Sequence, residues 1–282
     1  MNLKIVADST FNLDNKFIEE NNITVVPLNV IINGESFRDD IDVSIADVTN
    51  ALQSGKKVSS SQPSPVKYME VFETLKKEGA TDILCLTISS TLSGTYQSAK
   101  IAEREVEGVN IYVVDTLSTS VGAEIIAELV VEKAKENYSI EQLIQYIEHI
   151  KKNSGILMNL ENLNTLKLSG RITKIKAAIG NLIKVKPIIE YINGKVLIFN
   201  KMRTEKNVIS YIVERIKSEV KESTKKILIY VSHVNAIERV SRVAKALSEG
   251  IEHAVIKISR QISPVIAINL GYGGIGVAWC YE

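Results

Sequence analysis

Serine and threonine side chains gather in two short runs that are more elaborate than a turn requires. The first run is SSSQPS at residues 59–64, and the second is SSTLSGTYQSA at residues 89–99. Each hydroxyl donates a hydrogen bond from a short stem, and a helix N-terminus adds free backbone N–H groups and a favourable dipole. Together these groups can hold a carboxylate or a phosphate without a neighbouring cation. We therefore predict an anion site at these two runs.

A third hydroxyl-bearing segment, Asp8-Ser9-Thr10, follows the first apolar run of the chain. All three segments are predicted to lie where the chain leaves a strand and enters a helix, which is the ligand-binding edge of an open parallel sheet. Gly94 lets the backbone approach a ligand closely, and Thr95 is expected to cap the following helix. The plainer interpretation is that these serines only cap helices and fill turns, because Ser and Thr are favoured at both places.

Other patterns give little support to other chemistry. The chain has three histidines and no G-x-S-x-G turn, so a hydrolase triad is not supported; His233, which ends an apolar strand pattern, is the histidine of most interest. Asp39, Asp40 and Asp42 are expected to form a solvated acidic turn, and the two cysteines lack CxxC spacing, so no metal site is predicted. A dinucleotide site at GYGGIG, residues 271–276, would need a helix after it; a strand is predicted on each side, so no cofactor is expected.

Composition and charge narrow the class of protein. The chain has 282 residues, with 34 basic and 33 acidic side chains and a net charge of +1, which argues against a nucleic-acid binder. The opening MNLKIVADST enters a strand at once, without the basic and apolar regions of a signal peptide. No stretch approaches the roughly 18 apolar residues of a membrane span. We expect a soluble, cytoplasmic protein.

The order of the predicted elements divides the chain into two parts. In the first part, strands alternate with helices, which is typical of a parallel sheet covered on both faces; these strands are predicted at residues 3–7, 24–32, 83–88 and 110–115. The second part begins with a hairpin around Asn193-Gly194. Helices then follow at 205–222 and 236–247, and strands at 226–232, 254–259, 264–269 and 275–281. We predict an α/β fold with a parallel-sheet α/β/α domain at 1–157 and an α+β mixed-sheet domain at 158–282.

A basic stretch lies near the start of the second part. Arg171 follows Gly170 in LNTLKLSGRIT, residues 163–173, and lysines alternate with apolar residues after it. One interpretation is an amphipathic helix with a solvated basic face. The other is a lid over an apolar cavity, with Arg171 facing a negatively charged group.

Seven segments, taken in order, resemble the DegV family of bacterial fatty-acid-binding proteins: ADST, VSSSQPSP, ISSTLSGTYQSA, VVDTLSTSVG, LNTLKLSGRI, the KPII…GKV hairpin and KMRT. The resemblance covers essentially the whole chain. It implies a two-domain α/β fold with a long-chain fatty acid between the domains. It also implies a carrier and not an enzyme, because a separate fatty acid kinase phosphorylates the carboxyl group that the carrier presents.

The resemblance assigns residues to this site. Ser61 and Ser93 look like the hydroxyls that bind the carboxylate. The family often has threonine where this chain has Ser60, so the choice between Ser60 and Ser61 stays open. Arg171 matches an arginine that in the family lies near the carboxyl end and bears on phosphate transfer.

One position departs from the family pattern. The family usually closes with His-x-Gly-Pro-Gly, and here Asn269 stands at the histidine and Tyr272 at the proline. Asparagine forms hydrogen bonds but cannot take up a proton near neutral pH. Two alternatives remain. Asn269 motivates a lipid binder that is uncoupled from the kinase. The serine runs, as an anion site, also suit an enzyme or sensor for a small carboxylated or phosphorylated metabolite, with Arg171 or His233 in the chemistry.

The physics of burial agrees with a lipid ligand. About 16 methylene groups, as in C14–C18 acids, release roughly 13 kcal/mol on burial before the losses of association. A carboxylate at the end of such a tail is costly to bury unless several donors meet it. The serine runs would supply those donors.

Overall fold

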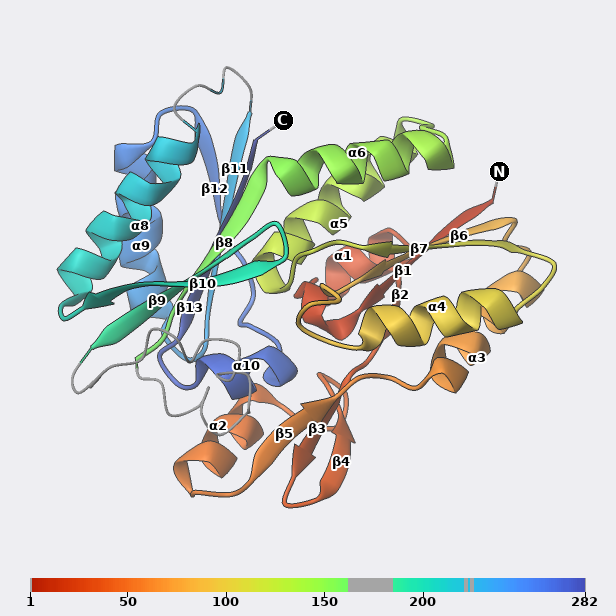
Figure 1. The fold of residues 1–282 in the computed structure, drawn as a ribbon, viewed down its shortest axis with the longest axis horizontal. Coiled ribbons are helices and arrows are strands. Elements are labelled where there is room, and N and C mark those ends of the chain that lie inside the picture. The colour runs from red at the N-terminus through yellow and green to blue at the C-terminus, as the bar shows by residue number, and fades with distance from the viewer. Residues whose placement is uncertain (1, 162–184, 221–222, 224–225, 282) are drawn as a thin grey trace.

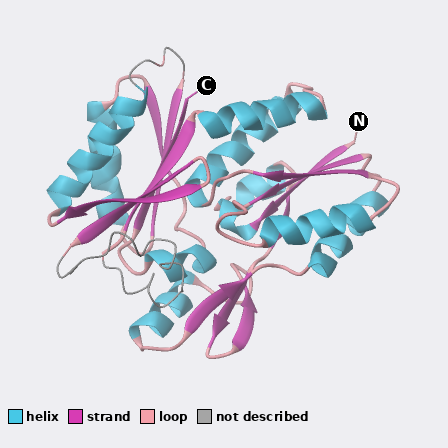
Figure 2. Ribbon diagram, viewed as in Figure 1, coloured by secondary structure: helices cyan, strands magenta, loops and turns pink. Residues whose placement is uncertain are grey.

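The computed structural model describes residues 2–161, 185–220, 223 and 226–281, with only the backbone of 197–201 described. Within these residues the chain forms a four-stranded, a six-stranded and a small three-stranded sheet (Figures 1 and 2). None of the described helices is both long and apolar enough to cross a bilayer.

The four-stranded sheet is parallel and comes from the first part of the chain. Its order is β2-β1-β6-β7, built from β1 (Leu3–Asp8), β2 (Thr24–Val26), β6 (Asp82–Thr87) and β7 (Asn110–Asp115). Successive residues of a strand point to opposite faces, so β1 and β6 are apolar on both. Val6 and Cys85 pack under α3 (Pro65–Lys77) and α4 (Thr95–Glu105). The other face packs on α5 (Ser120–Lys135), with η1 (Ser9–Phe11), α1 (Asn15–Glu20) and α6 (Ile140–Lys152) nearby.

The three-stranded sheet is antiparallel, with the order β4-β3-β5. It contains β3 (Asn29–Ile32), β4 (Glu35–Arg38) and β5 (Val58–Ser61), and α2 (Ile45–Gln53) lies beside it. The strand region predicted at residues 24–32 is broken at Pro27, as its proline suggests. Pro27 lacks an N–H for a ladder, and it separates β2 from β3, which join different sheets.

The six-stranded sheet is mixed, with the order β10-β9-β8-β13-β11-β12. Its strands are β8 (Ser154–Asn159), β9 (Lys186–Ile192), β10 (Lys195–Met202), β11 (Ile227–His233), β12 (Ala254–Ile258) and β13 (Ile275–Tyr281). Only the β11–β12 pair is parallel among the described pairs of this sheet. Helices α8 (Glu205–Val220) and α9 (Ile237–Gly250) cover one face.

Helix α5 covers the opposite face of the mixed sheet as well as one face of the parallel sheet (Figure 1). Leu84 and Leu86 of β6 and Tyr230 and Ala278 of the mixed sheet belong to the same buried cluster as the apolar side chains of α5. A helix that is apolar nearly all round is a core helix. The two sheets therefore share one central element.

The predicted α/β fold class, with a parallel sheet and a mixed sheet, is confirmed. The strand predicted at residues 264–269 is wrong, because these residues form helix α10 (Pro264–Leu270). Short apolar runs have no period that separates a strand from a buried helix. The boundary between residues 157 and 158 stays a prediction; it falls inside β8, whose pairing with β9 and β13 favours a division before Ser154.

Candidate functional site

The loop after β6, residues 88–94, carries the second serine run, and a buried carboxylate fixes where it starts. Asp8, at the end of β1, accepts a 2.6 Å hydrogen bond from the backbone N–H of Ile88. Asp8 also accepts hydrogen bonds from the backbone N–H and the hydroxyl of Thr10. Burial raises the pKa of Asp8 to about 6, against the opposing effect of these bonds. The segment Asp8-Ser9-Thr10 and the loop that carries the second serine run are thus tied together.

Hydroxyls pair with one another inside this loop. The Ser93 hydroxyl lies 2.9 Å from that of Thr95 and accepts a hydrogen bond from the Thr95 backbone N–H. Thr95 is buried and Ser93 is half-buried. The expectation that Thr95 caps the helix is wrong: Gly94 is the N-cap of α4, and the Thr95 hydroxyl is engaged by Ser93 instead.

The two serine runs lie side by side. A Cβ atom placed on Gly94 would come within 2.5 Å of Nε2 of Gln62, so the Gln62 side chain rests on the Gly94 backbone. Gln62 directly follows Ser61, the last residue of β5. The first run was predicted to follow a strand of the parallel sheet. This prediction is wrong, because the run begins in β5, which belongs to the small antiparallel sheet.

Ser60 and Ser61 point to opposite faces of the small sheet. Ser60 is paired with Val30, which is fully buried, so the two side chains share the inner face. Ser61 is paired with Asn29 on the other face and is exposed. Of the two serines, Ser60 therefore lies on the side of the apolar cluster formed with α2 and α10.

Helix α10 carries Asn269 to this region. It packs against α2 and β5, and its apolar residues join the cluster that contains Val30, Ile88 and half-buried Leu92. Asn269 is half-buried near the end of the helix. Arg171 and Gly170 lie outside the described residues.

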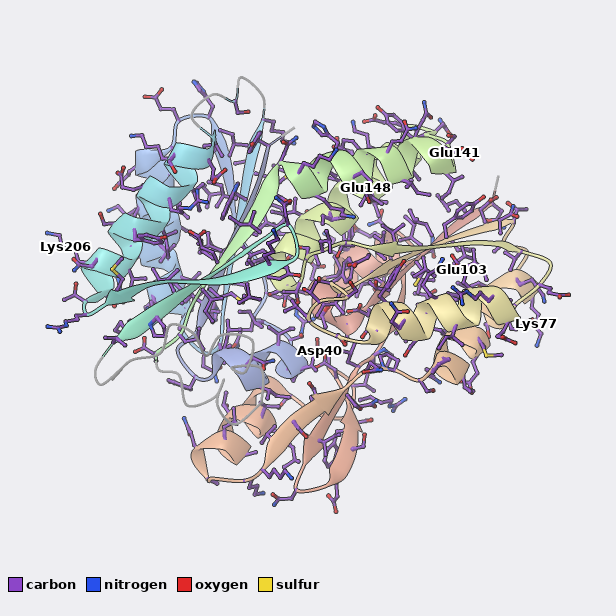
Figure 3. All side chains as sticks on the ribbon, in the orientation of Figure 1. Asp40, Lys77, Glu103, Glu141, Glu148 and Lys206 are labelled. Carbon is purple, nitrogen blue, oxygen red and sulfur yellow. The ribbon has the colours of Figure 1, made fainter. Side chains whose placement is uncertain are left out.

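Asp39 holds the start of α10. Its Oδ1 accepts a 2.8 Å hydrogen bond from the backbone N–H of Val265, 226 residues away. Its neighbour Asp40, labelled beside α10 in Figure 3, pairs with Arg260 at 2.7 Å. Asp39 is 1% exposed, so the expected solvated acidic turn is wrong at this residue. Burial raises the pKa of the Asp39 carboxyl to about 7.

Sequence reasoning missed Tyr191, which comes from the mixed sheet. Its hydroxyl lies 2.8 Å from the hydroxyl of Thr91 in the serine loop. The turn after β9 also reaches this loop, because a Cβ on Gly194 would lie 3.0 Å from Leu117 and 3.5 Å from Thr91. The tight Asn193-Gly194 turn was predictable, but the contact of Tyr191 with Thr91, which lies 100 residues earlier, was not.

Comparison with known proteins bears on the whole of this arrangement. The model of a family described as "Uncharacterised protein, DegV family" matches residues 2–282. A DegV domain-containing protein of Staphylococcus aureus strain COL is 33% identical over 275 residues, or 97% of this chain and 96% of that protein. Another, from Listeria innocua, is 31% identical over 278 residues, or 98% of each. The chain belongs to the DegV family.

Solved DegV structures share this fold. A DegV family protein from Thermus thermophilus, described as binding fatty acid, matches with a TM-score of 0.91 and 28% identity, covering 100% of both chains. DegV of Bacillus subtilis, described as a fatty acid binding protein, matches with a TM-score of 0.89 and 27% identity, again covering 100% of both chains. The resemblance noted in the sequence is confirmed.

The sequence also raised the question of His233, of a metal site and of the glycine-rich turn at residues 271–276. His233 is buried, which lowers its pKa, and its Nδ1 accepts a hydrogen bond from the Ala236 N–H just before α9. Among the described residues, no group of three or more His, Cys, Asp or Glu side chains could hold a metal ion. The turn at 271–276 joins helix α10 to β13, and not two strands as predicted.

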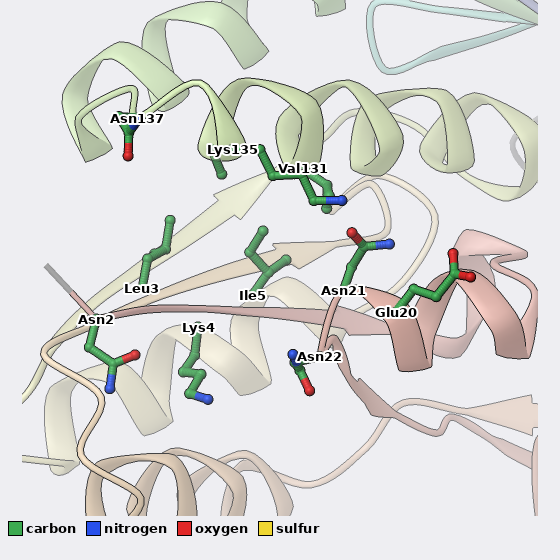
Figure 4. A pocket seen from close by; sticks show the side chains of 11 residues that line it. Asn2, Leu3, Lys4, Ile5, Glu20, Asn21, Asn22, Val131, Lys135 and Asn137 are labelled. Atoms are coloured by element: carbon green, nitrogen blue, oxygen red, sulfur yellow. The ribbon is translucent and has the colours of Figure 1, made fainter.

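A pocket of about 610 Å³ opens at the far edge of the parallel sheet (Figure 4). The start of β1, the end of α1 and the end of α5 line it, with Lys4, Asn21 and Lys135 among its residues. Parallel strands bring their carboxyl ends to the opposite edge, where Asp8 and the serine loop lie. This pocket is therefore separate from the candidate site.

Replacing Asp39 with asparagine is expected to stabilise this DegV protein more at pH 8 than at pH 5. The pKa of Asp39 is raised from 3.8 to about 7, so the folded protein keeps a proton that the unfolded chain releases across this window. The stability linked to that proton is lost as pH rises through the window, and the neutral amide avoids the loss. The advantage of the variant in urea unfolding should grow by roughly 1–3 kcal/mol between the two pH values. If the variant gains the same free energy of unfolding over wild type at pH 5 and at pH 8, this account is contradicted.

Proposed function

We propose that this DegV protein binds a long-chain fatty acid and holds its carboxylate between the two serine runs. The observation that carries the proposal is the contact of Gln62 with Gly94, because Gln62 belongs to the run at residues 59–64 and that run therefore lies beside the loop of Ser93. Hydroxyls on short stems from two separate sheets then converge on one place. Relatives of the same fold, from Thermus thermophilus and Bacillus subtilis, are described as binding fatty acids.

Between the two candidate serines of the first run, we assign carboxylate binding to Ser60. It shares the inner face of the small sheet with buried Val30, whereas Ser61 is exposed on the other face. A buried carboxylate needs donors that are themselves shielded from water, because hydrogen bonds are stronger in a low dielectric. Ser60 and Ser93 meet that condition better than Ser61.

Apolar residues next to the serines support an aliphatic tail. Leu92 of the serine loop and Met158 of β8 are half-buried, and each packs against both the α5 cluster and the α10 cluster. They therefore lie where the parallel sheet, the mixed sheet and α10 meet. A tail of about 16 methylene groups buried there would gain roughly 13 kcal/mol before association losses. A small metabolite would leave most of this apolar surface unused.

The second half of the proposal is that a fatty acid kinase phosphorylates the bound acid. It is supported by the family pattern around Arg171 and by the position of α10, which packs on β5 and carries Asn269. Asn269 replaces a histidine of that pattern, so it can orient a phosphoryl group through hydrogen bonds but cannot transfer a proton.

Native mass spectrometry of the protein purified from bacteria tests the first half. We expect a bound species with the mass of a C14–C18 acid, which is released on denaturation and restored when the stripped protein is incubated with palmitate. A stripped protein that takes up neither palmitate nor oleate at micromolar concentrations would overturn the proposal. A ligand without an aliphatic tail would favour a metabolite-binding function.

Asn269→His is expected to raise the rate of acyl-phosphate formation by a cognate kinase by about tenfold or more, since general acid–base groups contribute at least that much. The affinity for palmitate should change little, because asparagine and histidine both form hydrogen bonds. Single-turnover kinetics with radiolabelled ATP would measure the rate. Asn269→Gln is the control that keeps an amide, and it should not raise the rate. If the wild-type protein supports acyl-phosphate formation and the histidine variant has the same rate, Asn269 has no part in phosphoryl transfer.

A further inference from the structure

The segment from β7 into α5 contains two hydroxyls that have no role in the fold or in the proposed carboxylate site at Ser60 and Ser93. Thr119 is the N-cap of α5 and Ser120 is its first residue, and they are 2% and 3% exposed. Within the described part of the chain, neither hydroxyl has a hydrogen-bond partner. The Thr119 side chain forms no capping bond, and the first turn of α5 has no acidic residue.

Buried hydroxyls of this kind are unusual. Burying a hydroxyl without a hydrogen bond is unfavourable, and the great majority of buried polar side chains in proteins are paired. Helix α6 shows the ordinary arrangement: Ser139 accepts a hydrogen bond from the Gln142 N–H, and Gln142 accepts one from the Ser139 N–H. The N-cap of α10, Ser263, is also buried without a hydrogen-bond partner among the described residues, but that helix has only seven residues. The start of α5, a helix of 16 residues, instead combines two unpaired donors with the positive end of a helix dipole.

The start of α5 adjoins the loop of Ser93, which is part of the proposed carboxylate site. The carbonyl of Ser118 accepts a 2.9 Å hydrogen bond from the N–H of Ser89, and the carbonyl of Ser89 accepts one of 3.1 Å from the N–H of Ser93. On its other side the helix meets the mixed sheet, because a Cβ on Gly122 would lie 2.7 Å from Cδ1 of Ile156. The start of α5 therefore lies between the serine loop and apolar side chains of β8.

We propose that the N-terminus of α5, with the hydroxyls of Thr119 and Ser120, is an oxyanion subsite that binds the carboxylate of the bound acid together with Ser60 and Ser93. A carboxylate offers about four lone-pair positions, more than two serines satisfy. Neutral donors and a helix dipole suit a single negative charge held in an apolar setting. The identity of the ligand rests on the proposed function, whereas the subsite itself rests on the unpaired donors.

Thr119→Val and Ser120→Ala test the subsite, with Ser139→Ala as a matched control that removes a hydroxyl from a different helix start. We expect each test variant to bind palmitate about tenfold or more weakly, as for loss of a hydrogen bond to a charged group. Binding of 1-hexadecanol, which has the tail without the charge, should stay within about twofold of wild type. The ligand-free variants should melt at or above the wild-type temperature, because an unpaired buried hydroxyl has been removed.

The outcomes separate this inference from the proposed function. If wild type binds palmitate and both variants bind it equally well, the subsite is overturned and the fatty acid function stands. An equal loss of hexadecanol binding would also overturn it, since that indicates packing and not charge recognition. If wild type binds no palmitate, the proposed function fails. Inorganic phosphate then serves as the probe: binding that Thr119→Val abolishes supports the subsite with phosphate as its ligand, and no binding overturns it.

Discussion

Replacing Ser60 and Ser93 together with alanine is expected to weaken palmitate binding by about 10²- to 10⁴-fold. Each hydroxyl would donate a hydrogen bond to a charged oxygen, which contributes roughly 1.5–3 kcal/mol, and about 1.4 kcal/mol corresponds to a factor of ten. The loss should fall mainly on the dissociation rate, because the variant keeps the apolar surface that meets the tail. Displacement of a fluorescent fatty acid would measure the affinity.

Ser61→Ala is the matched control for this double variant. Ser61 is adjacent in sequence but exposed on the opposite face of β5, so its loss should change the affinity less than about threefold. A large loss with Ser61→Ala and none with Ser60→Ala would reverse the assignment of the two serines. If neither Ser60→Ala nor Ser93→Ala weakens binding, the carboxylate lies elsewhere.

Trp279→Ala is expected to lower the free energy of unfolding by about 3–5 kcal/mol, the range for removal of a large buried aromatic side chain. Trp279 is 1% exposed in the centre of the mixed sheet and lies opposite Gly155, whose missing side chain makes room for the indole ring. The guanidinium of Arg215 lies 5.9 Å from the ring centroid and covers it from α8. Such a loss is a large part of the stability of an ordinary domain.

Urea unfolding would measure this change, and Trp279→Phe is its control. The smaller aromatic ring should keep about half of the lost stability, because the cavity it leaves is smaller. Palmitate affinity, measured well below the melting temperature, should stay close to wild type, since Trp279 packs toward α8 and α9 and away from α5. A loss under about 1 kcal/mol would mean that the mixed sheet collapses to fill the space.

Features set by neighbouring residues were the ones that the sequence predicted. Ser139 and Gln142 have the S-x-x-Q spacing that is typical of a capping box, and they form one. Ser64 stands before Pro65, a residue favoured at the first position of a helix, and it caps α3. The hairpin turn at Asn193-Gly194 forms as predicted, with φ of 49° and 73°. In each case the side chain and its backbone partner lie within a few residues, so the local pattern determines the structure.

Features set by distant contacts were not predictable. Asp39 is buried because it reaches Val265 across the chain, and nothing in its local sequence distinguishes it from Asp40. The choice of Ser60 over Ser61 requires the register with Val30. Helix α10 is apolar at every position except Asn269, because it packs against both β5 and α2, and this removes the helical period from its sequence.

The place of α5 between the two sheets has a consequence for synthesis of the chain. The parallel sheet can cover one side of this helix as soon as residues up to 135 have left the ribosome, because its strands all precede α5. The other side waits for β11 and for β13, which ends at Tyr281. A nascent chain therefore carries an uncovered apolar face of α5 from the time residue 135 emerges until β13 does, and holdase chaperones have a defined target there during that interval.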